Sequence, residues 1–158
     1  MLERQEKLRI PMKNEVIELA IKIRSIYEQG SSEEFSLFMG SFQFPKNSCE
    51  GASRVFAHII TTRFPDCNIH VVEGYDYPND DRHYWVQIDD LIYDLTCDQF
   101  NISPKIILGE RTTPLITKYN DLEFISGRDI FENWSPGGRY NKLDTLGYVE
   151  YHLERTYK

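Results

Sequence analysis

The sequence predicts one α+β domain over residues 1–158, with helices first, an antiparallel meander next and a helix at the end. Three patterns predict this layout. Apolar residues recur at helical spacing early in the chain, short runs of β-forming residues separated by turn residues follow them, and helical spacing returns near the C-terminus. Helices segregated from an antiparallel sheet are typical of α+β proteins. No Gly-, Pro- or Ser-rich linker divides the chain into two domains.

Two clear helices are predicted ahead of the strands. Apolar side chains at helical spacing predict the first helix over Asn14–Gln29, with Asn14 as its N-cap. A shorter helical segment is expected over 32–39. Asn47 and Glu50, three residues apart, are typical of a capping box and predict the start of the next helix. The apolar stripe of that helix comprises Ala52, Val55, Phe56, Ile59 and Ile60.

The strands are predicted from runs of β-branched and aromatic residues bounded by turn residues. Two of these runs flank the dipeptide Asp89-Asp90, a spacing typical of a β-hairpin in which Ile88 faces Leu91. The expected strands and closing helix are, in order, the strands Ile69–Tyr77, His83–Ile88, Leu91–Thr96 and Lys105–Leu108 and the helix Asp144–Tyr157.

Charge and cysteine content narrow the classes of function. The chain has 25 acidic and 18 basic residues, a formal net charge of −7 and no basic stripe, so no nucleic-acid partner is expected. No apolar run is long enough to span a membrane, and no apolar stretch of a secretory signal follows the charged segment Met1–Lys13. Three cysteines are odd in number and too few for a disulfide framework. We therefore expect a soluble, cytoplasmic protein.

Cys49 is the first candidate for chemistry because it falls in the first turn of the second predicted helix. If Asn47 or Ser48 caps that helix, the helix dipole and the unpaired backbone N–H groups favour a thiolate at Cys49. The neighbouring Glu50 carboxylate acts in the opposite direction. The alternative for Cys49 is a small buried side chain, which is the common role of a free cysteine.

The predicted hairpin adds a histidine and a carboxylate. In its register Asp94 faces Trp85, and His83 lies two residues from Trp85, so His83 and Asp94 project from the same side. Diagonal neighbours of this kind have Cβ atoms about 7 Å apart or a little less, which is within reach of a hydrogen bond. A carboxylate there would fix the tautomer of the ring and stabilise its protonated form. The alternative is a pair that merely faces solvent.

Gln43 is the candidate oxyanion donor. It lies six residues before Cys49 on the segment leading into the same helix, so its amide and the Cys49 backbone N–H can both point at a developing oxyanion. The alternative for Gln43 is a solvated loop residue. No Cys/His pair has metal-ligand spacing and no phosphate-cradling loop is present, so no metal or cofactor is expected. Cys67 and Cys97 are expected to be packing residues.

Two segments carry a more specific pattern. Phe44–Ser53 places Cys49 at a helix start, and His83–Phe100 contains a His-x-Trp sequence, an Asp-x-Thr sequence eleven residues after the His, and then Asp-Gln-Phe. Together they resemble the papain-like/transglutaminase-like superfamily of Cys-His-Asp enzymes, in the form found among bacterial toxin and effector domains. The resemblance implies a nucleophile-bearing helix packed against an antiparallel β-sheet.

The resemblance also implies roles for the candidate residues. Cys49 would be the nucleophile, His83 the general base and Asp94 the residue that orients the ring. Gln43 matches the oxyanion glutamine of papain-type enzymes in spacing. The implied activity is that of a cofactor-free thiol hydrolase acting on protein amide bonds, a cysteine protease or a protein-glutamine deamidase of the toxin or effector kind.

Other functions stay open at this point. A transglutaminase-like cross-linker uses the same groups with an amine in place of water. A catalytically inactive papain-like module that binds a protein is the alternative from a different class. The expected partners are a protein or peptide substrate and a cognate inhibitor or immunity protein, with no membrane partner. The expected location is the cytoplasm, or another cell reached by a secretion system that needs no signal peptide.

Overall fold

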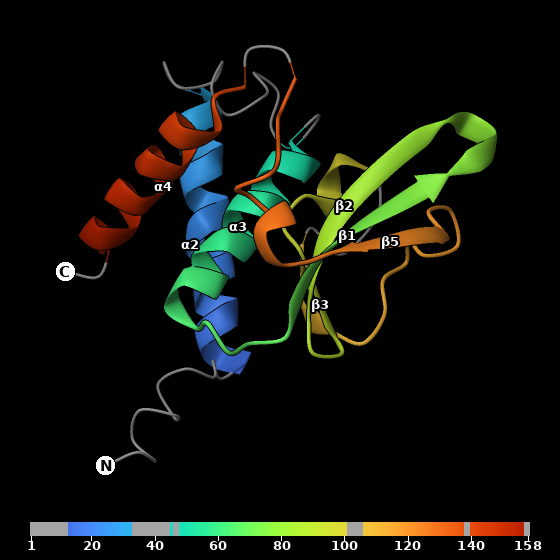
Figure 1. The fold of residues 1–158 in the computed structure, drawn as a ribbon, viewed down its shortest axis with the longest axis horizontal. Coiled ribbons are helices and arrows are strands. Elements are labelled where there is room, and N and C mark those ends of the chain that lie inside the picture. The colour runs from blue at the N-terminus through green and yellow to red at the C-terminus, as the bar shows by residue number, and fades with distance from the viewer. Residues whose placement is uncertain (1–12, 33–44, 46–47, 101–105, 138–139, 157–158) are drawn as a thin grey trace.

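The computed structural model describes residues 13–32, 45, 48–100, 106–137 and 140–156 (Figure 1). In this part of the chain the fold is α+β, with three α-helices and a five-stranded antiparallel sheet, as the sequence predicted. The helices are α2 (Lys13–Ser32), α3 (Cys49–Arg63) and α4 (Lys142–Thr156). The strands are β1 (Ile69–Asp76), β2 (Asp81–Ile88), β3 (Leu91–Asp94), β4 (Ile107–Glu110) and β5 (Asp121–Ile125). Three short 3₁₀ helices lie in the connections, namely η1 (Tyr77–Asn79), η2 (Cys97–Gln99) and η3 (Gly127–Asp129).

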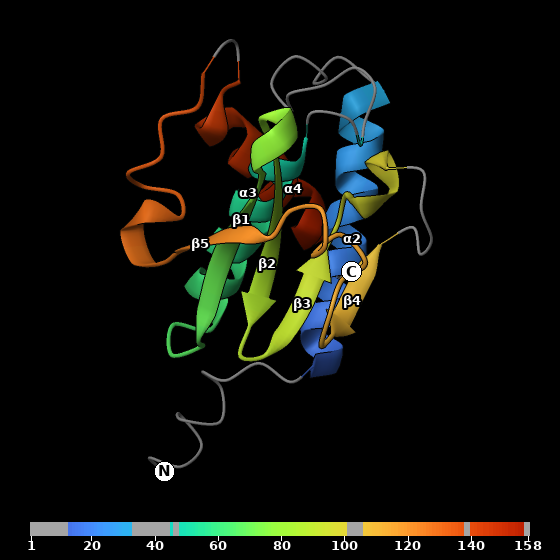
Figure 2. The same cartoon turned by 90° about the vertical axis from the view of Figure 1, so that its right-hand side faces the viewer.

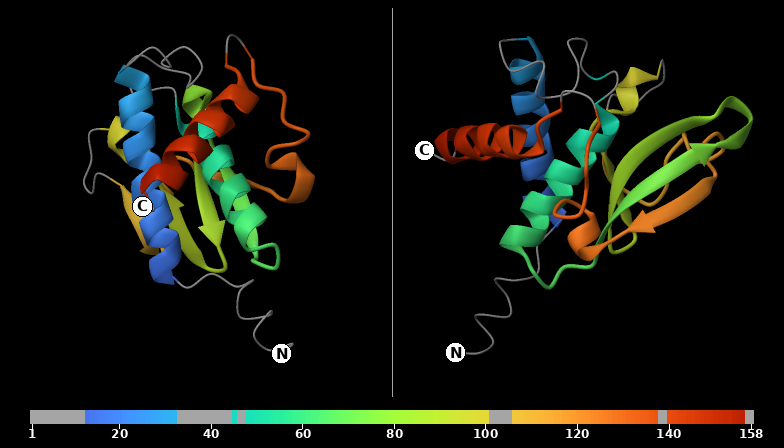
Figure 3. Two further views of the ribbon diagram at one scale, coloured as in Figure 1. Left: turned by 90° about the vertical axis from the view of Figure 1, so that its left-hand side faces the viewer. Right: turned by 45° about the horizontal axis from the view of Figure 1, so that its top comes forward.

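The helices form one layer and the sheet another. Figure 2 shows the strands in the order β4-β3-β2-β1-β5, with α2, α3 and α4 behind them on one face. α3 packs against β2 and β1, while α2 packs against α4 and α3 (Figure 3). The expected packing of the Cys49-bearing helix against an antiparallel sheet is therefore present. Within the described ranges, no helix combines the length and the apolar character that a membrane span requires.

The β2–β3 hairpin has the register that the sequence predicted. Ile88 pairs with Leu91, and Val86 pairs with Tyr93. Asp89 begins the two-residue turn with a φ of 56°, a left-handed conformation that Asp tolerates better than most residues. A slip of one residue would move every buried side chain to the other face of the sheet. The turn therefore determines which side chains of β2 lie on each face of the sheet.

Apolar side chains form a core on each face of the sheet. The larger core lies between the sheet and the helices, and β2 contributes Tyr84, Val86 and Ile88 to it. The smaller core lies on the opposite face and receives Trp85 from the same strand. The buried members of the smaller core are Val72, Trp85, Ile92, Cys97, Ile107, Leu115 and Tyr119.

Several elements differ from the predicted ones. β3 ends at Asp94 rather than at Thr96, and β4 runs over Ile107–Glu110 rather than Lys105–Leu108.

The N-terminal helix and the last strand differ most. α2 begins at Lys13, so Asn14 lies inside the helix rather than at its N-cap. α2 extends beyond its expected end at Gln29 to Ser32, and Gly30 in this last turn is buried, so packing outweighs the low helix propensity of glycine. Strand β5 was not predicted, because four of its five residues are exposed and their side chains show no buried face. The predicted helical segment after Ser32 lies outside the described residues.

Candidate active site

The Cys49 thiol lies at the N-terminus of α3. Ser48 occupies the N-cap position, so Cys49 is the first helical residue, where backbone N–H groups have no partner within the helix. A negative charge is stabilised at such a helix start. The Cys49 side chain is half-buried and packs against the larger core. Asn47, the other predicted cap, lies outside the described residues.

The Glu50 carboxylate beside Cys49 is paired with a cation. Arg54, one turn further along α3, donates from Nε to Oε2 of Glu50 at 2.9 Å. Glu50 is therefore engaged along the helix instead of reaching back to form the predicted capping box. The positive charge of Arg54 thus offsets the negative charge of Glu50 beside Cys49.

His83 and Asp94 form a buried hydrogen bond. Nε2 of His83 lies 2.6 Å from Oδ2 of Asp94, and neither side chain is more than 1% exposed. The other carboxylate oxygen, Oδ1, accepts a hydrogen bond from the Thr96 backbone N–H at 2.9 Å. The contact that the hairpin register predicted is thus present. The Thr96 hydroxyl donates to the same carboxylate oxygen, Oδ1, at 3.4 Å, so both polar groups of Thr96 help to orient the carboxylate.

The pKa of His83 results from opposing effects. Burial lowers it, because an imidazolium loses its solvation in the protein interior. The Asp94 carboxylate raises it through its charge and its hydrogen bond, and a hydrogen bond with the Cys49 side chain raises it further. The net result is a rise in the pKa of His83 from its ordinary 6.5 to about 10. The imidazole is therefore mostly protonated at neutral pH.

Gln99 is a third partner of His83 that was not among the predicted site residues. Its side-chain Nε2 lies 3.0 Å from Nδ1 of His83. Gln99 is carried by η2, which follows β3 after a two-residue connection. The available signal was the Asp-Gln-Phe that ends the second motif, in which Gln99 stands five positions after Asp94. Spacing alone does not reveal that a 3₁₀ turn folds this side chain back onto His83.

Aromatic side chains surround the His83 ring. Its centroid lies 5.9 Å from Trp85, 4.9 Å from Phe100 and 5.7 Å from Tyr119. Gly74 pairs with His83 across β1 and β2 and leaves room for this packing. A Cβ at Gly74 would lie 2.8 Å from Cβ of Tyr119 and 2.9 Å from the Trp85 ring. The apolar enclosure lowers the local dielectric and so strengthens the interaction between the imidazole and its carboxylate partner.

The remaining predicted residues fall into two groups. Gln43, the predicted oxyanion donor, lies outside the described residues. Cys67 and Cys97 are placed as packing residues, half-buried against the larger core and fully buried in the smaller core, respectively. Burial raises the pKa of the Cys67 thiol to about 11 and that of the Cys97 thiol to about 12, so both remain protonated at neutral pH.

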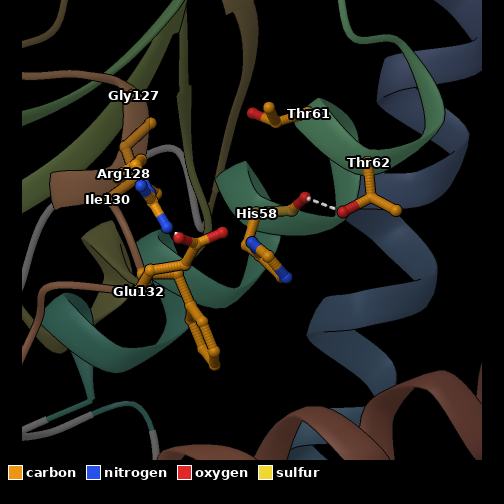
Figure 4. Close-up of a pocket in the computed structure, with 8 residues that line it drawn as sticks. His58, Thr61, Thr62, Gly127, Arg128, Ile130 and Glu132 are labelled. Carbon is orange, nitrogen blue, oxygen red and sulfur yellow. Dashed lines mark hydrogen bonds and ion pairs between the residues drawn. The ribbon is translucent and has the colours of Figure 1, made fainter.

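Two cavities lie apart from this cluster. One of about 290 Å³ is lined by the second half of α3 and by η3, and contains His58 and the ion pair between Arg128 and Glu132 (Figure 4). Another of about 420 Å³ lies beside β5 and is walled by Trp134. Neither is lined by Cys49 or by its histidine and carboxylate partners. Among the residues that the structure describes, no group of three or more His, Cys, Asp or Glu side chains could hold a metal ion.

Comparisons with known proteins attach no family to this geometry. No protein-family model, curated protein or solved structure matches the chain. The case for a function therefore rests on the site itself, which is where function resides in any fold.

Proposed function

We propose that the chain is a thiol enzyme of the papain-like/transglutaminase-like kind that acts on protein amide bonds. Cys49 is its nucleophile, His83 its general base and Asp94 the residue that orients His83. The observation that carries this proposal is the fully buried 2.6 Å hydrogen bond between His83 and Asp94. The Cys49 side chain also helps to raise the pKa of the same ring. Burying an ionisable pair costs free energy unless its charges are compensated. The thiol at the start of α3 gives a reason to bury this pair, because the imidazole can act as the base for a cysteine nucleophile.

The first half-reaction forms a thioester. Nδ1 of His83 takes the proton of the Cys49 thiol, and the sulfur attacks the carbonyl carbon of a substrate amide. The negative charge moves to the carbonyl oxygen, where the Cys49 backbone N–H at the start of α3 stabilises it. The C–N bond then breaks, and His83 gives its proton to the leaving nitrogen.

The second half-reaction removes the acyl group. Water attacks the thioester carbonyl while His83 accepts a proton from it. The C–S bond then breaks, and His83 returns this proton to the sulfur, which restores the Cys49 thiol and releases the carboxylic acid. A peptide bond as substrate gives proteolysis with an amine as the leaving group, and a glutamine side chain gives deamidation with ammonia as the leaving group. We favour these two hydrolytic outcomes over amine transfer, because the two motifs resemble those of toxin and effector domains.

The first test measures the reaction rate of each cysteine with iodoacetamide, mapped by mass spectrometry. We expect Cys49 to react at least about tenfold faster than Cys67 at neutral pH, because the thiolate is the reactive form. His83→Ala should abolish this difference. His58→Ala is the matched control, because it removes an imidazole from the same helix as Cys49 but from the cavity shown in Figure 4. It should leave the Cys49 rate unchanged.

The labelling result separates the enzyme from its alternative. Slow labelling of Cys49, equal to that of Cys67 in the wild-type protein, would contradict the proposal and favour a protein-binding module. Fast labelling that survives in His83→Ala would show that the thiol is activated without this base, and would remove His83 from its assigned role.

The products then distinguish the two hydrolytic activities. Unfolded test proteins are incubated with the wild-type chain, and mass spectrometry reads out cleaved peptide bonds and glutamines converted to glutamates. Cleaved bonds identify a protease, and converted glutamines identify a deamidase. Cys49→Ser is the control, and products that persist with this variant would exclude Cys49 as the nucleophile.

A further inference from the structure

Both ring nitrogens of His83 are engaged by side chains. Nε2 lies against the Asp94 carboxylate, which can only accept hydrogen bonds, so Nε2 carries a hydrogen. In the neutral ring Nδ1 is then an acceptor, and the Gln99 amide nitrogen, 3.0 Å away, can donate to it. Nδ1 is also the nitrogen left to exchange a proton with Cys49. Gln99 therefore lies at the nitrogen through which the proposed chemistry passes.

An amide suits this place in both protonation states of the ring. Once His83 takes a proton, Nδ1 becomes a donor and the Gln99 N–H group can no longer bond to it. Turning the planar amide over presents its carbonyl oxygen instead, which accepts from the charged ring. A leucine would bond in neither state, and a glutamate would bond only to the charged ring. Glutamine can thus hold His83 throughout a catalytic cycle.

An ion pair with α2 fixes the turn that carries Gln99. Nη1 and Nη2 of Arg24 donate to the two carboxylate oxygens of Asp98 at 2.7 and 2.8 Å. Nη1 also donates to the Leu95 carbonyl oxygen at 2.7 Å. Arg24 is only 5% exposed, although a buried guanidinium is stable only when its hydrogen-bond donors are satisfied. We call these contacts of Arg24 with Asp98 and Leu95 the Arg24 fork. Since Asp98 directly precedes Gln99 in η2, the Arg24 fork fixes the backbone from which Gln99 reaches His83.

We propose that Gln99 is a positioning residue that keeps the Nδ1 edge of His83 aligned with Cys49, and that Arg24 holds Gln99 in place through Asp98. This inference rests on the proposed function and adds two residues to its machinery. In this proposal the contacts of Arg24 with Asp98 do more than join α2 to η2, because they also affect the site. A merely structural fork would affect stability alone, whereas a positioning fork affects His83 through Gln99.

The test uses Gln99→Leu, Arg24→Lys and the double variant. Lysine keeps the positive charge of Arg24 but cannot form the two-pronged contact with Asp98. The first readout is the ratio of the Cys49 to the Cys67 labelling rate. We expect Gln99→Leu to lower this ratio about tenfold, because small misplacements of a catalytic group are costly. Arg24→Lys alone should also lower the labelling ratio. In the double variant, Arg24→Lys should add nothing to the effect of Gln99→Leu.

The second readout is the nitrogen NMR titration of the His83 ring. Gln99→Glu offers only an acceptor, so its ring should stay charged to a higher pH than the ring of Gln99→Leu. Folding of each variant is checked by its urea unfolding curve. If Arg24→Lys lowers the labelling ratio equally with Gln or Leu at position 99, the link through Gln99 is wrong.

These outcomes differ from those that would defeat the proposed function. If wild-type Cys49 labels no faster than Cys67, the proposed function fails whatever the variants do. If wild-type Cys49 is fast and Gln99→Leu is equally fast, with an unchanged His83 titration, the positioning role is overturned while the proposed function stands. A lowered ratio with a shifted titration, in variants that unfold like the wild type, supports the positioning role.

Discussion

The two sides of the sheet are built for different purposes. On the helical side β2 buries Tyr84, Val86 and Ile88 in a core of apolar residues. On the other side the same strand buries Trp85 together with His83, which lies against a buried carboxylate. Apolar burial stabilises the fold at about 25 cal/mol per Å², whereas an ionisable pair costs free energy to bury. We therefore expect the larger core on the helical side to contribute most of the stability that offsets the cost of burying this pair.

Asp94→Asn should have the largest effect and should fall on function. An asparagine amide can donate to His83 and so favours the wrong ring tautomer. In triad enzymes this lowers the turnover rate by about 10⁴-fold. The turnover of the test proteins measures the effect, with Asp90→Asn as the control. Asp90 is 66% exposed in the neighbouring turn, so its replacement should leave turnover unchanged. Near-normal turnover in Asp94→Asn would remove Asp94 from the site.

Phe56→Ala should have the next largest effect and should fall on stability. Phe56 is fully buried in the larger core, with its ring edge-on to Tyr93 at a centroid distance of 6.2 Å. Removing its ring should lower the free energy of unfolding by about 3–5 kcal/mol, measured by urea denaturation. The matched control is Phe124→Ala on β5, because Phe124 is 47% exposed and should cost far less. Equal losses in the two variants would mean that the larger core is not the main source of stability.

Gly74→Ala tests the packing around His83. The new Cβ would lie within 3 Å of Tyr119 and Trp85, and the strain should cost about 1–3 kcal/mol. The labelling rate of Cys49 should also fall, because these rings enclose His83. Gly147→Ala is the control. Nothing lies within 4 Å of a Cβ at Gly147, which is on α4, so alanine should stabilise that helix by up to about 1 kcal/mol. An unchanged labelling rate in Gly74→Ala would separate this packing from the site.

The last prediction concerns the free energy of unfolding as a function of pH, which should change over several pH units. The pKa of His83 is raised from 6.5 to about 10, so between these values the folded chain holds a proton that the unfolded chain has released. The stabilisation is complete below pH 6.5 and is lost as the pH rises through about 10. Urea unfolding at several pH values should therefore show wild type losing more stability across this window than His83→Gln. Parallel curves for the two proteins would contradict a raised pKa.

Local patterns were enough to predict the hairpin and the contact it creates. The Asp89-Asp90 turn between two β-forming runs sets the register, and the two-residue repeat of a strand then places Asp94 beside His83. The start of α3 at Cys49 followed from the capping residues before it, although Glu50 bonds to Arg54 rather than forming a capping box. Periodicity and turns are short-range signals, and these features depend on short-range structure.

Features that depend on distant contacts could not be predicted in this way. The place of Gln99 depends on η2, which is tied to Arg24, and the contact between Arg24 and Asp98 joins residues 74 positions apart. Strand β5 is held by backbone pairing with β1, and its exposed side chains carry no pattern of burial. Neither contact leaves a periodic signal in the sequence around it.

The long separation between Arg24 and Asp98 has a consequence for the newborn chain. A ribosome makes Cys49 before His83, Asp94 and Gln99, so the growing polypeptide carries the proposed nucleophile while its base does not yet exist. The turn that steadies His83 can form only when residue 98 reaches back to α2. A cell that translates this protein would thus be spared the proposed activity until the sheet forms, and a message truncated before residue 83 would yield a thiol without its proposed base.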